Sequence, residues 1–515
     1  MATVSASLLE KMKLPEGLDD PKLQRHFEVY ARDGKLFEAE SQPQKDGPII
    51  FNDIHEISWI IGAGENGFGA LVERGDFLFQ GPLSYYSRTG HWGLSPGYEF
   101  GDYGFNRPIL AGCIGCHSGR PRPLPATNGR YKQPAFSQLT IGCENCHGPG
   151  AAHIAAMKLQ EPAPDDHAGI VNPARLSSTL ANDICMSCHQ MGDVRVFKPG
   201  KSYADFRPGK PLDDVLEILM VAPTRETPPD VDHLDHFYSM ALSKCYRASG
   251  GKLTCITCHD PHVEPTSDQA SAYFAKKCMG CHDEHSCKAP MALRQSVKPP
   301  DNCIFCHMPK RDVQTIQHAS ATNHRIPATP NEPYPDSTFD HAGAAPPNLI
   351  QLASGTRPAS PLSLLQAYGE LLDTKPEYAP RYSDLLDELE KTESGSALIQ
   401  SALGRRDLRR GQYESAIAHL QKAITIGPPQ AVMFADEAEA MQKRGGLEDA
   451  LNLQKKAVEL DPFNPVLQKN EIVLLINLKQ YAEARKALEN YLEIFPQDSF
   501  MRQMLEKANQ GAAAK

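Results

Sequence analysis

Six copies of the pentapeptide Cys-x-x-Cys-His are the residues of this sequence whose types and spacing could do chemistry. The six cysteine pairs are Cys113 and Cys116, Cys143 and Cys146, Cys185 and Cys188, Cys255 and Cys258, Cys278 and Cys281, and Cys303 and Cys306. The histidines that complete the pentapeptides are His117, His147, His189, His259, His282 and His307. With 14 Cys and 19 His in 515 residues, chance would give about 0.01 such pentapeptides in the whole chain. This spacing is the attachment signature of c-type haem, so we expect six haem c groups.

The spacing has a physical reason. Two intervening residues let both sulfurs reach the same edge of one porphyrin, and the adjacent histidine then lies under the iron as its proximal ligand. A zinc site or a thioredoxin-like dithiol also uses paired cysteines. Neither of them explains a histidine directly after all six pairs, so we expect the chemistry of this chain to be electron movement.

Two cysteines, Cys245 and Cys287, lie outside the motifs. Haem c is attached outside the cytoplasmic membrane, where unpaired thiols oxidise. We therefore predict a disulfide between Cys245 and Cys287, which would clamp the segment that carries the fourth and fifth motifs. The alternative is a pair of free, buried thiols.

The second axial ligand of each iron decides between two kinds of function. A second histidine gives an iron that only transfers electrons, whereas an open position implies substrate chemistry. His153, in CHGPGAAH, is the first candidate, and His262 is too close to proximal His259 to reach the same iron, so it should serve a neighbouring haem. The other candidates are His318, His324 and His236, with His55 preferred over His285, His233 and His91 for the sixth position.

Composition limits the remaining possibilities. Charged residues are 23% and hydrophobic residues 41% of the chain, and the formal net charge is −10. No basic stripe is present, which disfavours nucleic-acid binding, and no run of 18 apolar residues encodes a membrane span. The first residues, MATVSASLLEKMKLPEG, do not form a signal peptide. Since haem c requires export, we expect a mature protein of the bacterial periplasm or exterior whose signal is not part of this chain.

The motifs divide the chain into four expected regions. Residues 1–110 mix strand-like runs with glycine turns and indicate a small β-rich or mixed cap. Residues 111–325 carry the haem motifs, several of them only 23 to 30 residues apart, which leaves no room for a core made of protein alone. Residues 326–360 form a Pro-rich linker, and residues 361–515 are helical. The fold class is therefore mostly α with much irregular loop.

The C-terminal region repeats itself every 34 residues. Ala416, Ala450 and Ala484 keep this step, as do Tyr413, Leu447 and Tyr481, and Gly411 and Gly445, whereas Lys479 breaks the glycine series. The pattern resembles the tetratricopeptide repeat (TPR), a solenoid of helix pairs. The concave face of such a solenoid could bind a partner protein or a second copy of the chain.

Four segments carry a wider resemblance: ENCHGPGAAH, SKCYRASGGKLTCITCHDPH, CHMPK and HASATNHRI. They resemble multihaem c-type cytochromes of the cytochrome c-554 family, in particular longer relatives with C-terminal TPR repeats. The resemblance implies haems with two histidine ligands, stacked in pairs, and supports His153 as a ligand. The chain has no Cys-x-x-Cys-Lys site, and it has six motifs rather than the eight of hydroxylamine oxidoreductase.

These observations predict an electron carrier rather than an enzyme. It would pass electrons between redox partner proteins through six haems that mostly or all have two histidine ligands. One alternative is a multihaem oxidoreductase that acts on a small nitrogen or sulfur compound at one open haem. The other alternative is a subunit of a cytochrome filament.

Overall fold

The structure of the chain is a computed structural model that describes residues 1–44, 47–62, 64, 67–159, 169–189, 192–229, 236–312, 320–352 and 357–513. It divides into two compact units. Unit 1 consists of Met1–Thr140 and Ser383–Lys515, and unit 2 of Ile141–Tyr382.

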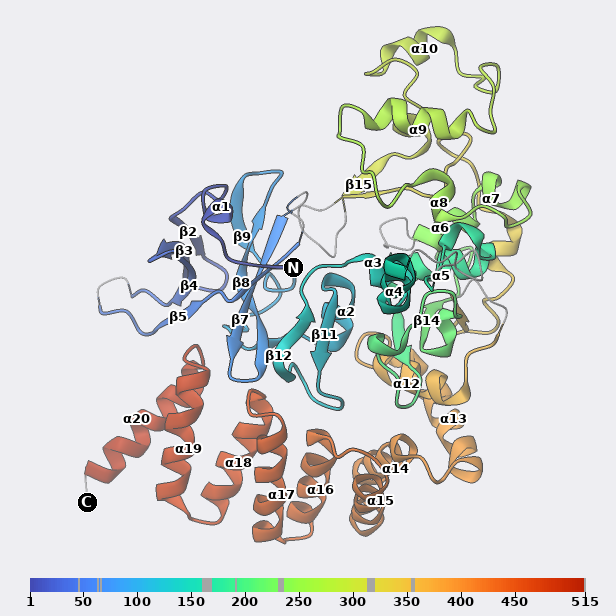
Figure 1. Ribbon diagram of the computed structural model, residues 1–515. Coiled ribbons are helices and arrows are strands. Elements are labelled where there is room, and N and C mark those ends of the chain that lie inside the picture. Colours follow the sequence, from blue (N-terminus) through green and yellow to red (C-terminus); the bar gives the residue numbers. More distant parts are fainter. Residues whose placement is uncertain are drawn as a thin grey trace. The chain divides into compact units, whose positions relative to one another are not determined.

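Strands dominate the N-terminal part of unit 1, drawn in blue in Figure 1. One antiparallel sheet has the strand order β2-β3-β4-β5, and a second has the order β1-β6-β7-β8-β10, with β9 paired to β8. The strands are β1 Ala2–Thr3, β2 Glu16–Asp20, β3 Arg25–Arg32, β4 Lys35–Ser41, β5 Asn52–Glu56, β6 Trp59–Ile61, β7 Gly67–Arg74, β8 Phe77–Tyr86, β9 His91–Leu94 and β10 Arg107–Pro108, and a short helix, α1, spans Ala6–Leu9. Both sheets contribute to one core, which contains Phe27, Leu36, Phe79 and Trp92. The expected β-rich N-terminal part is confirmed.

The hairpin of β3 and β4 shows why these residues form strands. Phe27 and Val29 alternate with more exposed residues and are buried, as a strand with one face on the core requires. The connecting residues Asp33 and Gly34 have φ values of 52° and 75°. A two-residue turn with positive φ at both positions matches the twist of paired strands, and an Asp-Gly sequence favours it.

The first Cys-x-x-Cys-His motif belongs to unit 1, although we expected it in one region with the other five. The elements around it are α2 Ala111–His117, β11 Arg120–Pro123 and β12 Tyr131–Gln138. Ile114, between the two cysteines, is fully buried in a cluster with Leu78, Tyr131 and Phe136. Ile114 therefore anchors the motif helix, while the side chain of His117 remains exposed.

The C-terminal part of unit 1 is a row of antiparallel helix pairs, drawn in red in Figure 1. The helices are α14 Ala397–Arg409, α15 Tyr413–Ile426, α16 Ala431–Lys443, α17 Leu447–Leu460, α18 Pro465–Asn477, α19 Tyr481–Ile494 and α20 Ser499–Ala513, after α13 Ala379–Thr392. The first helices of three pairs start at residues 397, 431 and 465, so the expected 34-residue step is confirmed. Ala416, Ala450 and Ala484 are all buried, as small residues at a close helix contact should be.

Phe463 joins the helix pairs to the strands of unit 1. It lies in the turn between α17 and α18, and its ring centre is 5.1 Å from that of Phe77 and 4.7 Å from that of Phe79. The guanidinium carbon of Arg74 lies 4.5 Å from the same ring centre. The repeats thus pack on the β-sheet core instead of standing apart as a separate module.

The described part of unit 2 consists of short helices and two small sheets. Its helices are α3 Cys143–His147, α4 Ala151–Leu159, α5 Ser178–His189, α6 His236–Ala241, α7 Lys244–Ala248, α8 Cys255–Cys258, α9 Ala270–Cys278, α10 Met291–Ser296, α11 Cys303–His307 and α12 Pro361–Leu371. Its strands are β13 Val194–Phe197, β14 Leu216–Val221, β15 Lys310–Asp312, β16 Ser320–Thr322 and β17 Leu349–Gln351, with the sheet orders β13-β14-β17 and β15-β16. A hydrophobic cluster on β14 and α6 includes Leu216, Ile218 and Phe237.

The Pro-rich region differs from the extended linker that its composition suggested. β17 pairs with β14, with Ile350 opposite Met220. The hydroxyl of Tyr378 donates a hydrogen bond of 2.7 Å to the carbonyl of Pro347. The sheet edge pairs the backbone of Leu349–Gln351, and the whole region belongs to unit 2.

The segment that carries the last three motifs has almost no core of its own. None of the helices α8 to α11 contains a buried residue. Val263, Met279 and Phe305 are large apolar side chains that remain exposed there. The described side chains of this segment therefore do not fold it by burial among themselves.

Candidate haem sites

Short helices present the cysteine pairs of the motifs in unit 2. The second and sixth motifs form α3 and α11, the third ends α5, and the cysteines of the fourth form α8. Residues three apart lie on the same face of a helix. Both thiols of each of these motifs can therefore point to one side, as attachment to one porphyrin requires.

The thiols of the second, third and fourth motifs lie near one another. Burial and the neighbouring thiol of Cys185 raise the pKa of Cys146. A hydrogen bond to Cys255, together with burial, raises the pKa of Cys185. The amide oxygen of Asn182, which is buried in α5, accepts a hydrogen bond of 2.9 Å from the backbone of Cys255. Asn182 thus fixes the start of the fourth motif against the helix of the third.

Cys245 and Cys287 are free thiols in the structure. Burial raises the pKa of Cys245, and the nearby thiol of Cys281 adds to this shift. Cys287 instead lies near Cys303, whose pKa is raised by burial first and then by Cys287. Because the two thiols have different neighbours, the Cys245–Cys287 disulfide stays a prediction.

The distances between histidine rings test whether the motif histidines and the candidate second ligands can bind the same haem iron. An imidazole nitrogen lies about 2 Å from a metal that it binds, so two rings on opposite sides of one iron have centres about 6 Å apart. Aromatic rings also pack at about 4.5–7 Å, and distance alone does not assign a pair. A ligand pair must in addition join one motif histidine to one other histidine.

Among the described residues of unit 2, three pairs meet both conditions. The ring centres of His147 and His262 are 6.0 Å apart, with an angle of 14° between the ring planes. Those of His189 and His236 are 5.7 Å apart. The third pair, His259 and His324, has a separation of 6.2 Å. Each pair joins a different motif to a different candidate second ligand.

Backbone carbonyls orient three of the rings. The Nδ1 atoms of His147, His307 and His324 lie 2.7, 2.8 and 2.8 Å from the carbonyl oxygens of Val171, Pro327 and Thr322. Since a carbonyl only accepts, each Nδ1 must donate, and Nε2 then carries the free electron pair. This is the arrangement that orients histidines that bind metals. The donor set therefore fits haem iron.

His236 and His324 also touch each other. Their ring centres are 4.5 Å apart, which is too short for two ligands on opposite sides of one iron and is an ordinary ring contact. Burial, followed by the neighbouring ring of His236, lowers the pKa of His324 to about 4. Burial also lowers the pKa of His259. Neutral imidazole is the form that binds a metal.

Other candidates lie elsewhere. His55 is in β5, where Nε2 is 2.9 Å from Asp53 Oδ1 and the ring packs on Phe105 at 4.4 Å. His153 lies near the start of α4, and His318 lies outside the described residues. Within the described part of the chain, no ring contact joins His117, His282 or His307 to another histidine. The second ligands of these three motifs stay predictions.

Sequence reasoning missed the groups that hold the ligands in place. Asn182 carries no motif signal, and the carbonyls of Val171, Pro327 and Thr322 are backbone groups that any residue type supplies. Only the folded chain brings them to the rings.

In the described ranges, no helix combines the length and the apolar character needed to cross a membrane.

No known family profile matches the chain. Over 215 residues, or 41% of the chain, it is 25% identical to the multiheme cytochrome MtrA of Shewanella baltica, and this stretch is 56% of that protein. Over 119 residues, or 22% of the chain, it is 33% identical to the BBSome complex member BBS4 of Mus musculus, covering 23% of that protein. The chain thus spans little more than half of one relative and about a quarter of the other.

Solved structures are similar over smaller parts. The first TPR of Spaghetti (RPAP3), bound to an HSP90 peptide, is 24% identical over 23% of this chain and 96% of that one, with a TM-score of 0.21. YrrB, a TPR protein with an unusual peptide-binding site, is 18% identical over 30% of this chain and 74% of that one, with a TM-score of 0.25. At these TM-scores the alignments carry no argument, and the repeat architecture rests on the helix pairs of the structure itself.

Proposed function

We propose that this protein transfers electrons through six covalently bound c-type haems. The observation that carries the proposal is the pairing of three motif histidines with three other histidines at separations of 5.7 to 6.2 Å. The similarity to a multiheme cytochrome over 41% of the chain supports it. Haem iron with two strong-field ligands changes oxidation state without binding a substrate.

Each residue of a motif has a defined task in this proposal. The two thiols form thioether bonds to the porphyrin, and the motif histidine binds the iron through Nε2. His262, His236 and His324 supply the second ligand to the irons held by His147, His189 and His259, respectively. Because these second ligands close the irons to small molecules, electron transfer is favoured over oxidoreductase chemistry at the three sites.

Electron transfer also requires redox partner proteins, and we propose that the helical repeats contact them. Leu398, Val432 and Val466 occupy the same position in three successive repeats and are 36%, 38% and 61% exposed. Apolar side chains in an exposed row are typical of protein contact surfaces. Light scattering over a wide concentration range separates a second copy of this chain from a different protein as the partner.

Two measurements test the main proposal. The intact mass of exported protein gives the number of covalent haems, for which we expect six. A steady-state panel of hydroxylamine, nitrite and sulfite tests for an open site, and we expect no turnover. Fewer than six haems would overturn the haem count. Turnover that is lost when one cysteine pair is replaced would support an oxidoreductase instead.

A further inference from the structure

We propose that Arg325 binds a carboxylate, and that this carboxylate is a propionate of the haem held by His259 and His324. The proposal rests on the proposed function, because it assumes that this haem is present. It starts from a buried cation that forms no salt bridge with the described residues. The carboxylate of Glu332 is near enough to interact with its charge, but it pairs with Lys244 at 3.3 Å. Arg325 is only 8% exposed, and no ion pair of the described residues includes it.

The guanidinium group is held rigidly on one side. Nη2 donates hydrogen bonds of 2.5 and 2.6 Å to the carbonyls of Glu332 and Pro333. The guanidinium carbon lies 3.9 Å from the centre of the Tyr334 ring. Nε, in contrast, is buried and has no hydrogen-bond partner. The group is therefore fixed in place, with a donor left over.

A buried charge without a partner is costly. Removing an ion from water costs several kcal/mol even after the protein relaxes, and a partner of opposite charge offsets that cost. A guanidinium suits a carboxylate in particular, because its planar donors match the two oxygens. The unused donor of Arg325 therefore points to an anionic group that the side chains of the described residues do not supply.

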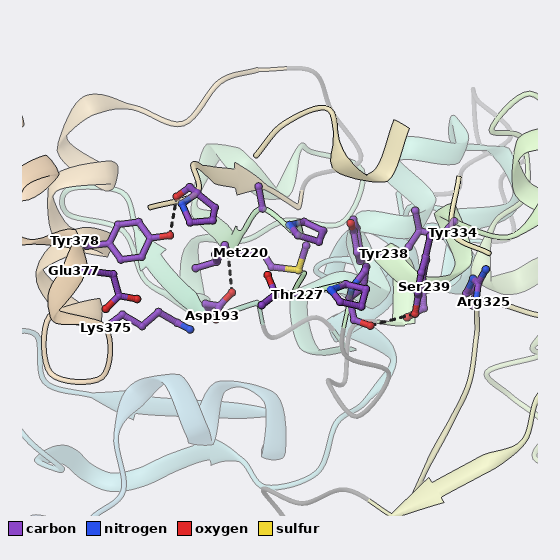
Figure 2. Close-up of a pocket in the computed structure, with 17 residues that line it drawn as sticks. Asp193, Met220, Thr227, Tyr238, Ser239, Arg325, Tyr334, Lys375, Glu377 and Tyr378 are labelled. Atoms are coloured by element: carbon purple, nitrogen blue, oxygen red, sulfur yellow. Dashed lines mark hydrogen bonds between the residues drawn. The ribbon is translucent and has the colours of Figure 1, made fainter. Parts of the chain in front are cut away.

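A pocket beside Arg325 provides the space. It has a volume of about 370 Å³ and is lined by residues that include Tyr238, Ser239, Arg325 and Tyr334. Figure 2 shows Arg325 at one end of the pocket, near Tyr334 and Ser239, whereas Asp193, Lys375 and Glu377 lie at the other end. The acidic side chains that line the pocket thus lie away from the guanidinium.

The position in the chain identifies the haem. Arg325 directly follows His324, the candidate ligand paired with His259. Ile326, the next residue, has a φ of +49°, a conformation that is unfavourable for a β-branched residue and is retained where the surroundings enforce it. Tyr238 and Ser239, which also line the pocket, belong to α6, which begins with His236. The pocket therefore adjoins two candidate ligands.

The test uses the exported haem-bearing protein and compares wild type with the variants Arg325→Gln, Arg325→Lys and Arg225→Gln. Arg225 is the matched control, because it lies in the same unit, is 66% exposed and pairs with Asp336. The haem content of every sample is measured first by intact mass. Each protein is then titrated spectroelectrochemically, with and without added phosphate at constant ionic strength.

We expect Arg325→Gln to lower the midpoint potential of one haem, because loss of a nearby positive charge favours the oxidised iron. Arg325→Lys should lower it less, and Arg225→Gln should leave all potentials unchanged. A propionate partner gives the same result with and without phosphate. A free anion instead gives a wild-type potential that depends on phosphate and an Arg325→Gln variant that does not respond to it.

Identical titration curves for wild type, Arg325→Gln and Arg325→Lys, in samples with full haem content, would overturn the inference and leave the proposed function intact. A haem deficit in the wild type would overturn the proposed function instead. If Arg325→Gln does not accumulate as folded protein, the Arg325→Lys variant carries the comparison, because it keeps the charge and loses the Nε donor.

Discussion

At the scale of single residues, electron transfer depends on three histidines outside the Cys-x-x-Cys-His motifs. They are the proposed second ligands His262, His236 and His324. The sequence indicated all three as candidate second ligands. It also indicated that His262 serves a neighbouring haem, because it lies only three residues after His259. It could not identify the partner of each, because His147 and His262 meet only through the folding of unit 2.

Replacement of His262 by alanine tests the best-aligned pair. We expect one haem, the one attached through His147, to become high spin, because it loses a strong-field ligand. His419→Ala is the control, since His419 lies in α15 of the helical repeats, where its Nδ1 is 2.8 Å from Gln400 Oε1. Resonance Raman spin-state bands measure the change. Spectra that are identical for both variants and wild type would show that His262 only packs against His147.

Glu38 offers a test of the N-terminal core. Its side chain is completely buried, and burial raises its pKa from 4.5 to about 8, although the backbone amide of Leu83 donates a hydrogen bond to it. The folded protein therefore holds the proton more tightly than the unfolded chain. The stability that the protonated Glu38 contributes is fully present below pH 4.5 and is lost as the pH rises towards 8.

Glu38→Gln cannot ionise, so it should be more stable than wild type by a few kcal/mol at pH 8 and about equal at pH 4.5. Urea unfolding at both pH values measures the difference, and Glu10→Gln, at an exposed position, is the control. A stability difference that does not change with pH would mean that the Glu38 carboxyl is already ionised in the folded protein.

At the scale of elements, the sequence predicted the elements that follow a regular residue pattern and did not predict those that depend on contacts between distant segments. The 34-residue step predicted the helix pairs of the repeats, and the strand-like runs predicted a β-rich N-terminal part. The hairpin of β3 and β4 with its Asp-Gly turn was not predicted. The position of β17 was not readable, because a Pro-rich composition says nothing about a sheet edge elsewhere in the chain. The attachment of the first motif to unit 1 depends on the contacts of Ile114 with residues far away in sequence.

Lys479 illustrates a pattern that is preserved in structure and broken in sequence. It has a φ of +60°, close to the values of +73° and +92° at the equivalent Gly411 and Gly445. A left-handed conformation costs a residue with a side chain about 1–2 kcal/mol. The turn geometry of the repeat thus overrides the preference of lysine.

Lys479→Gly should therefore stabilise the repeats by about 1 kcal/mol. Gly445→Ala should destabilise them by a similar amount, since an added Cβ meets nothing within 4 Å and only the backbone conformation matters. Thermal unfolding of both variants measures the two effects. A Lys479→Gly variant that is less stable than wild type would show that the lysine side chain makes a compensating contact.

At the scale of the whole molecule, unit 1 builds its own core, whereas the motif-rich part of unit 2 does not. The spacing of the motifs in the 111–325 region indicated this difference, because the motifs lie too close together for a core made of protein alone. The helices α8, α9, α10 and α11, which contain no buried residue, agree with it. We infer that the haems themselves order this segment.

Protein made without haem attachment should therefore be cut by protease first between residues 255 and 307, while the two parts of unit 1 resist. Limited proteolysis followed by mass spectrometry locates the cuts, and haem-bearing protein is the control. Equal protection of this segment with and without haem would show that the polypeptide folds it unaided.

Low-temperature EPR of the oxidised haem-bearing protein, with spin quantitation against total haem, tests the central claim most directly. The three histidine pairs predict low-spin signals that account for at least three irons, and a pure electron carrier predicts low-spin signals for all six. Fewer than three low-spin irons would contradict the assignment of His262, His236 and His324 as ligands, and with it the account of this protein as an electron carrier.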